Sequence, residues 1–232
     1  MGQANAISAL LKKLEYSFND PALLDEALTH RSYASKNNER LEFLGDGILN
    51  FVIADELFKQ YPDVQEGDLS RLRANLVNKE SLADIAAKLQ LGDVIQLGSG
   101  ELKSGGFRRP SILADTVESI FGAVYCDAGF EACRALIVRL YSEKLASPTD
   151  LQSLKDPKTQ LQELLQSRHF PLPEYEVTKI SGKAHAQMFH VNCNISQMQI
   201  NVNGEGKSRR KAEQVAAQNA IELVKNKFEA TE

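Results

Sequence analysis

The 232-residue sequence contains no tryptophan, only three cysteines, and no apolar run near the roughly 18 residues that span a bilayer. Its first residues, MGQANAISALLKKLEY, lack a basic segment followed by an apolar core and a small-residue cleavage site. Hydrophobic residues nevertheless make up 43% of the chain, which is enough for a substantial core. We therefore expect a soluble globular protein in the cytoplasm, without membrane contact.

The cysteines Cys126, Cys133 and Cys193 are odd in number and have no CxxC spacing. Disulfide frameworks use cysteines in pairs, and structural zinc sites need closely spaced ligands, so the sequence indicates neither. All three lie in apolar or strand-like stretches. We expect them to be buried free thiols.

Charge is distributed unevenly along the chain, although the net charge is only −4. Residues 1–154 hold 16 Lys and Arg against 22 Asp and Glu, a net charge of −6, whereas residues 155–232 hold 11 against 9, a net charge of +2. Apolar spacing is helical before the break, and the stretch SPTDLQSLKD at 147–156 loses this periodicity. The sequence predicts a helical domain over 1–146, a linker over 147–154, a second domain over 155–226 and a tail over 227–232.

The second domain has the pattern of a helix, three antiparallel strands and a helix. Asp156 and Pro157 are typical of an N-cap and first helical residue, and the helix should end near Ser167. Period-two alternation then predicts strands around residues 175–177, 189–195 and 198–202. Ser208 should cap the last helix, with an apolar face made of Ala212, Val215, Ala216, Ala220 and Leu223.

This last helix begins with an unusual cluster of cations. A cation at a helix N-terminus opposes the helix dipole by about 0.3–1 kcal/mol, and free backbone N–H groups there favour an anion. The arrangement therefore indicates a phosphate-binding site; the alternative is a solvated charged turn. The cluster comprises Lys207, Ser208, Arg209, Arg210 and Lys211.

Residues 155–226 resemble a double-stranded RNA-binding domain. The stretch GEGKSRRKAEQVAAQNA is similar to the signature of that family, with arginines in place of two lysines. The resemblance implies that the second helix start contacts phosphates across the major groove of the RNA, whose shape is read rather than its sequence. It also implies minor-groove contacts from Thr159, Gln162, Glu163 and His185; the alternative for His185 is an exposed loop residue without a role.

The stretch NNERLEFLGDG places three carboxylates in a predicted helix. Because an α-helix turns by about 100° per residue, Glu39, Glu42 and Asp46 fall within about 60° of one another. The same side also carries Phe43, Leu49 and Ile53. We therefore expect a helix that is apolar nearly all round and largely buried. Burying several carboxylates together is costly unless cations or altered protonation compensate.

A second acidic pair, Asp115 and Glu118 in ILADTVESIFGAVY, is also predicted on one face of an apolar helix. Four or five converging acids favour a hard divalent ion with oxygen ligands, and Mg²⁺ fits best. The alternative is a set of salt bridges with the available arginines Arg31, Arg40, Arg71, Arg73, Arg108 and Arg109.

The stretch NERLEFLGD is similar to the signature of the ribonuclease III family, bacterial type. Together with the RNA-binding domain, this resemblance covers nearly the whole chain. It implies an all-α nuclease domain followed by a small α+β RNA-binding domain. It also implies metal ligands at Glu42, Asp46, Asp115 and Glu118, and catalytic acids at Asp46, Glu118, Glu39 and Glu66. The residue that follows GD in this signature is usually serine or another small residue, and here it is Gly47. A glycine in a helix interior lowers helix stability by about 1 kcal/mol relative to alanine.

The resemblance further implies an endoribonuclease acting on double-stranded RNA with Mg²⁺, or Mn²⁺ in its place, and no small-molecule cofactor. A homodimer would leave 5′-phosphate and 3′-hydroxyl ends with a short 3′ overhang while processing ribosomal, messenger and transfer RNA precursors. A non-catalytic double-stranded RNA-binding protein and a phosphatase for small substrates are the alternatives. We interpret Asp68 as the N-cap of a helix starting at Leu69 and assign His30 no role.

Overall fold

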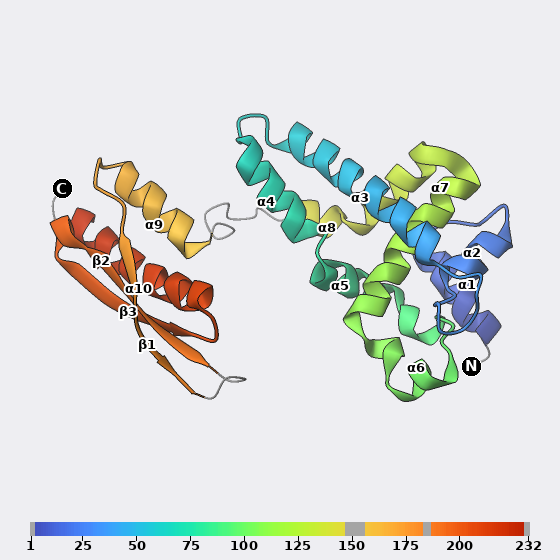
Figure 1. The fold of residues 1–232 in the computed structure, drawn as a ribbon. Helices are drawn as coiled ribbons and strands as arrows, with labels where there is room; N and C mark the ends of the chain where they lie inside the picture. Colours follow the sequence, from blue (N-terminus) through green and yellow to red (C-terminus); the bar gives the residue numbers. More distant parts are fainter. Residues whose placement is uncertain (1–2, 147–155, 183–186, 230–232) are drawn as a thin grey trace. The chain divides into compact units, whose positions relative to one another are not determined.

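The computed structural model describes residues 3–146, 156–182 and 187–229 (Figure 1). The chain divides into two compact units, Met1–Thr149 and Asp150–Glu232. The predicted linker over 147–154 lies outside the described residues.

The first unit is helical. Its α-helices are α1 (Gln3–Leu14), α2 (Pro21–Ala27), α3 (Glu39–Gln60), α4 (Glu66–Leu76), α5 (Lys79–Leu89), α6 (Ser99–Lys103), α7 (Pro110–Leu140) and α8 (Ser142–Ala146). Two 3₁₀ turns, η1 (Leu91–Asp93) and η2 (Gly106–Arg108), connect some of them. The helix α7 is interrupted at Gly129, whose φ of 81° and ψ of −173° are not helical. The all-α prediction for this part of the chain is confirmed.

The helices α3 and α7 form the centre of this unit and cross each other in Figure 1. Both contribute fully buried side chains, among them Leu49 and Ile53 of α3 and Ile120 and Phe121 of α7. The expectation that α3 is largely buried is wrong. Its side chains Phe43, Phe51 and Phe58 are 84%, 60% and 71% exposed, so one stripe of the helix presents apolar surface to solvent even though the ring of Phe51 lies 5.8 Å from that of Phe130.

The second unit consists of α9 (Pro157–Gln166), β1 (Glu174–Ser181), β2 (Met188–Ile195), η3 (Ser196–Met198), β3 (Ile200–Gly206) and α10 (Arg209–Glu229). The strands form an antiparallel sheet in the order β1-β2-β3. The predicted α-β-β-β-α order is confirmed. Asp156 caps α9 as predicted, because its side chain accepts a hydrogen bond from the backbone N–H of Thr159.

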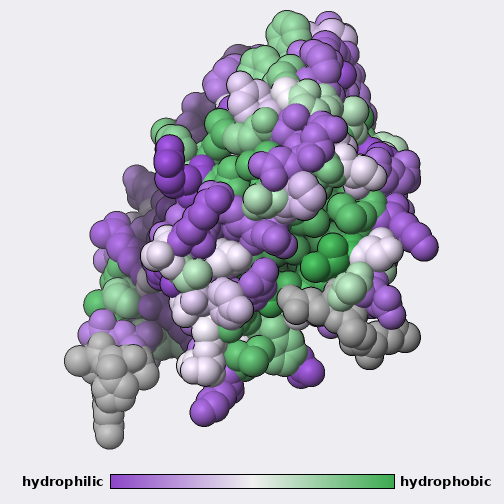
Figure 2. Space-filling model, turned by 90° about the vertical axis from the view of Figure 1, so that its right-hand side faces the viewer, coloured by the Kyte–Doolittle hydropathy of each residue, from purple (hydrophilic) through white to green (hydrophobic). Residues whose placement is uncertain are grey.

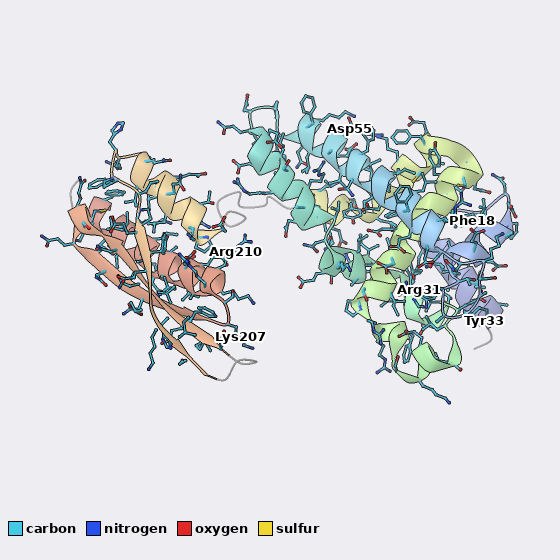
Figure 3. All side chains as sticks on the ribbon, viewed as in Figure 1. Phe18, Arg31, Tyr33, Asp55, Lys207 and Arg210 are labelled. Carbon is cyan, nitrogen blue, oxygen red and sulfur yellow. The ribbon has the colours of Figure 1, made fainter. Side chains whose placement is uncertain are left out.

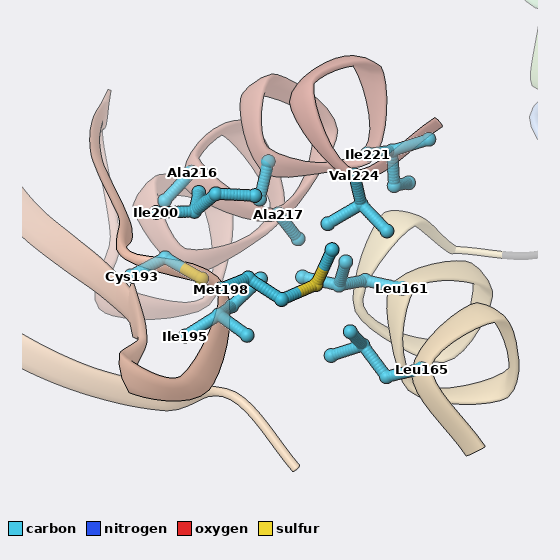
Figure 4. Close-up of a cluster of buried hydrophobic side chains, with 11 residues drawn as sticks. Leu161, Leu165, Cys193, Ile195, Met198, Ile200, Ala216, Ala217, Ile221 and Val224 are labelled. Carbon is cyan, nitrogen blue, oxygen red and sulfur yellow. The ribbon is translucent and has the colours of Figure 1, made fainter. Parts of the chain in front are cut away.

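One face of this sheet packs against the two helices (Figure 4). Val191, Cys193 and Ile195 are buried and alternate with half-exposed residues, which agrees with the period-two alternation that predicted this strand. The predicted apolar face of α10 is partly wrong. Val215 and Leu223 are exposed, and the core instead receives Ala217, Ile221 and Val224 along with the predicted alanines.

Cys133 and Cys193 are buried free thiols as expected, but Cys126 is exposed. Within the described part of the chain, no helix is both long and apolar enough to cross a membrane. On the face shown in Figure 2, hydrophilic residues surround a group of hydrophobic ones.

Candidate metal centre and nucleic-acid interface

Three of the predicted acids converge in the first unit. Glu42 lies near the start of α3, and Asp115 and Glu118 lie one turn apart on α7. One carboxylate oxygen from each lies within 4.8 Å of the other two. The three side chains are half-buried. Two helices that are distant in sequence therefore build a compact group of oxygen ligands.

Two glycines allow the helices to come this close. A Cβ atom on Gly45 would lie 1.8 Å from the backbone oxygen of Glu118, and one on Gly122 would lie 2.2 Å from the backbone oxygen of Leu41. No side chain fits at either position, so the contact between α3 and α7 is made through backbone atoms. Local sequence patterns do not reveal this requirement. By contrast, a Cβ atom on Gly47 would have no atom within 4 Å, so glycine is not required for packing there.

The pKa values of all three carboxyl groups are raised. For Glu118, burial and the negative charges of Asp46, Asp115 and Glu42 raise the pKa to about 8. Burial and the charges of Asp115 and Glu39 raise the pKa of Glu42, and burial raises that of Asp115. Mutual repulsion of this kind is relieved by a bound cation.

The salt-bridge alternative is not supported by the geometry. Across residues 3–146, 156–182 and 187–229, no lysine or arginine forms a salt bridge with Glu42, Asp115 or Glu118. Lys79, at the start of α5, lowers the pKa of each carboxyl group through its charge, but it makes no ion pair with them. No sequence pattern points to this lysine. Hard oxygen donors at short mutual distance, without a paired side chain, fit a divalent ion.

The remaining predicted acids are not among the three carboxylates within 4.8 Å of one another. Asp46 is exposed, and its carboxylate oxygen Oδ1 accepts a hydrogen bond of 2.8 Å from the side-chain amide of Asn50. Glu39 is exposed and pairs with Arg31 at 3.2 Å. Glu66 lies in the first turn of α4 and accepts a hydrogen bond from the hydroxyl of Ser70.

Two smaller predictions about neighbouring residues have different outcomes. Asp68 is not an N-cap, because α4 already begins at Glu66 with Gln65 as the capping residue; Asp68 pairs with Arg71 instead. His30, which received no role, lies with Arg31 (Figure 3) in the wall of a cavity of about 390 Å³. The same cavity is lined by Glu39, Glu42, Asp115 and Arg109.

The predicted nucleic-acid interface combines the starts of α9 and α10. On α9, the hydroxyl of Thr159 donates a 2.8 Å hydrogen bond to Asp156, and Gln162 and Glu163 are exposed. A hydrogen bond of 2.7 Å from Lys158 of α9 to Glu213 of α10 joins the two helices. His185 lies outside the described residues.

The cations of the second unit cluster where α10 begins, and Figure 3 labels Lys207 and Arg210 there. The side chains of Lys207, Arg209, Arg210 and Lys211 are exposed. The hydroxyl oxygen of Ser208 accepts a hydrogen bond of 3.2 Å from the backbone N–H of Lys211, as expected of a capping residue. An exposed helix N-terminus flanked by cations suits a phosphate group.

A helical unit with clustered acids and an α-β-β-β-α unit with a cationic helix start define a nuclease that carries its own RNA-binding unit. Comparison with known proteins agrees. The model of ribonuclease-III-like domains matches residues 20–145, and the model of the double-stranded RNA binding motif matches residues 157–224.

Ribonuclease 3 of Nitrosococcus oceani is 56% identical over 222 residues, which cover 95% of this chain and 95% of that protein. Ribonuclease 3 of Vibrio atlanticus is 55% identical over 220 residues, which cover 95% and 98%. A solved nuclease domain of ribonuclease III from Campylobacter jejuni, described for flexibility in a region involved in dimer formation, is 48% identical with a TM-score of 0.58. That match covers 59% of this chain and 96% of the domain.

The chain belongs to the ribonuclease III family. It is an endoribonuclease that acts on double-stranded RNA, and the non-catalytic alternative is not favoured. The double-stranded RNA-binding domain in the second unit supports double-stranded RNA as the partner of this chain.

Proposed function

We propose that Glu42, Asp115 and Glu118 hold Mg²⁺ at the catalytic centre, with Mn²⁺ able to replace it. The observation that carries this proposal is the convergence of three carboxylate oxygens within 4.8 Å. Oxygen ligands of this kind suit both ions. When bound, the ion activates water for attack on phosphorus and stabilises the departing ribose oxygen.

The other acids complete the proposed centre. Asp46 lies one turn beyond Glu42 on α3 and raises the pKa of Glu118 through its charge, which supports its role as a further ligand and catalytic acid. The amide of Asn50 orients its carboxylate. Glu39 lines the same cavity as Glu42 and Asp115, which supports a contact with the cut strand. Glu66 is the fourth proposed catalytic acid.

We further propose a homodimer. The exposed stripe of Phe43, Phe51 and Phe58 on α3 is supporting evidence, because large exposed apolar surfaces mark interfaces. Glu66 lines a hollow together with Phe51 and Phe58, so its proposed role depends on the dimer. The solved Campylobacter jejuni domain also has a region involved in dimer formation. Sedimentation should give twice the mass of one chain.

Twofold symmetry then explains the proposed products. An isologous dimer places one acidic centre on each strand of the duplex, so that each protomer makes one cut. The products would carry 5′-phosphate and 3′-hydroxyl ends with a short 3′ overhang. Ribosomal, messenger and transfer RNA precursors in the cytoplasm are the proposed substrates.

In this proposal the work is divided along the chain. Residues 1–146 carry the cutting chemistry, 147–154 are the proposed linker and 155–226 hold the RNA. Of the tail proposed over 227–232, residues 227–229 belong to α10 and residues 230–232 lie outside the described residues. Phosphates would contact the cation cluster Lys207, Ser208, Arg209, Arg210 and Lys211. The minor groove would contact Thr159, Gln162, Glu163 and His185.

Incubation with a long RNA duplex tests the function. Wild-type protein should shorten the duplex with Mg²⁺ and leave it intact in EDTA, whereas Asp115→Asn should leave it intact in both. The single strand of the same sequence should remain uncut. Cleavage in EDTA would contradict the proposal, and hydrolysis of a small phosphate ester alongside an intact duplex would support the phosphatase alternative.

A further inference from the structure

Glu213 is a buried acid that pairs with Arg209 of the cation cluster. It lies on α10 one turn after Arg209, and only 8% of the residue is exposed. Both of its carboxylate oxygens are used. Oε2 accepts a 2.7 Å hydrogen bond from Lys158, and Oε1 accepts one of 2.8 Å from the Nε of Arg209.

This carboxylate connects two secondary-structure elements. Lys158 lies in the first turn of α9, and Arg209 is the first residue of α10. The ammonium group of Lys158 is further held over the ring of Tyr175 on β1, 4.4 Å from its centre. One buried side chain thus joins the starts of the two helices that form the predicted nucleic-acid interface.

A negative charge next to the cation cluster does not by itself favour the binding of RNA. Burial raises the pKa of Glu213, but the hydrogen bonds and charges of Lys158 and Arg209 outweigh it and lower the pKa below its ordinary value. The group is therefore ionised at neutral pH. An ionised carboxylate beside phosphate-binding cations repels RNA, so a benefit of another kind has to outweigh this repulsion.

Geometry supplies such a benefit. Charge-assisted hydrogen bonds to a planar guanidinium fix its orientation, and Arg209 is bound through Nε while 65% of its side chain remains exposed. A fixed arginine loses less conformational freedom when it meets a phosphate, which favours binding.

We propose that Glu213 is a positioning residue for double-stranded RNA binding, which orients Arg209 and holds the first turn of α9 against α10. The proposal rests on the proposed function in one respect, namely that these helix starts contact the RNA. Glu213 itself touches no RNA in this account. It acts through Lys158 and Arg209.

The substitution Glu213→Gln distinguishes the effect of the negative charge on RNA affinity from the effect of positioning Arg209, because the two effects have opposite signs. Removing a negative charge by itself would tighten binding. Loss of positioning should instead weaken the affinity of the full chain for duplex RNA in EDTA by about tenfold, since a hydrogen bond between charged groups is lost. Glu222→Gln is the matched control, because Glu222 is an exposed acid on the same helix, and its affinity should stay within about twofold of wild type.

Cleavage kinetics with Mg²⁺ provide a second readout. Glu213→Gln should raise KM and leave kcat unchanged, because the cutting chemistry lies in the other unit; a partly unfolded preparation would lose kcat as well. Lys158→Met, which keeps the Glu213–Arg209 pair, should also weaken binding. The double variant should bind no more weakly than the weaker single variant, because both changes break the same connection. If Glu213→Gln is unfolded, the RNA affinity of Lys158→Met tests the proposed connection in its place.

The inference is overturned if Glu213→Gln binds duplex RNA as tightly as wild type or more tightly. If Glu213→Gln is unfolded, the same result for Lys158→Met overturns it. The triple variant R209A/R210A/K211A is measured in parallel. It distinguishes a wrong role for Glu213 from a wrong assignment of the RNA-binding interface. Weak binding by the triple variant alone would refute only the role of Glu213. Unchanged binding by the triple variant would refute the interface itself.

Discussion

The two units of the chain treat their charged side chains in opposite ways. In the first, Glu42, Asp115 and Glu118 are half-buried acids whose pKa values are raised by burial, and the negative charges of neighbouring acids raise those of Glu42 and Glu118 further. In the second, Arg210 and Lys211 stand exposed at a helix start. Clustering acids in a half-buried site costs free energy unless a bound cation or altered protonation compensates, whereas solvated cations cost little. The cutting chemistry therefore depends on a close helix crossing that holds the acids together, and phosphate binding depends on exposed cations at a helix start.

The largest effect on this comparison should come from Gly45→Ala. Its new Cβ would meet the backbone of Glu118 and push α3 from α7. We expect the free energy of unfolding to fall by about 1–3 kcal/mol and cleavage to fall about 100-fold, because the acids lose their mutual geometry. Thermal unfolding and a cleavage assay measure both quantities.

Gly47→Ala is the matched control, two residues away on the same helix. Its methyl group meets no atom within 4 Å, so stability should rise by up to about 1 kcal/mol and cleavage should be retained. Equal losses from the two variants would show that the close crossing of the helices is not what holds the centre together.

A smaller effect is expected from R209A/R210A/K211A in the second unit. Affinity for duplex RNA should weaken about tenfold or more, and the slope of log affinity against log salt should fall by up to about three. Cleavage at saturating RNA should change little. Filter binding over a salt series measures the slope, with Lys225→Ala, an exposed lysine near the other end of α10, as the control. An unchanged slope would place the phosphate contacts elsewhere.

The smallest effect concerns the pH dependence of stability in metal-free protein. The raised pKa of Glu118, about 8 against 4.5 for an ordinary glutamate, means that folded protein binds this proton more tightly than unfolded protein. Its stabilising contribution is complete at low pH and is lost as pH rises from 4.5 towards 8. The melting temperature of wild type should therefore fall by a few degrees more over this range than that of Glu118→Gln. Parallel curves would contradict the raised pKa.

Local patterns predicted much of the molecule. The N-cap at Asp156, the alternation in β2 and the α-β-β-β-α order follow from short-range rules and agree with the structure. Helical spacing also placed Asp115 and Glu118 on one face, and together with Glu42 they form the three-carboxylate group. Properties set within a few turns of chain are readable from sequence.

What the sequence left open depends on distant contacts. The need for Gly45 and Gly122 arises only when α3 and α7 meet, 77 residues apart. The apolar residues around α3 predicted burial of the helix, yet Phe43 is 84% exposed. Which apolar residues of a helix are covered depends on elements that are distant in sequence. Val215 and Val224 are both apolar, and only the position of the sheet decides which of them enters the core.

The most direct test of the division between chemistry and binding is Glu118→Gln. Cleavage rate with saturating RNA and Mg²⁺, and affinity for the same duplex in EDTA, should be measured on one preparation. The account predicts a cleavage rate lowered about 100-fold or more, because a metal ligand loses its charge, with affinity within about twofold of wild type. A variant that cuts within about tenfold of the wild-type rate, or that loses its affinity for RNA while remaining folded, would contradict it.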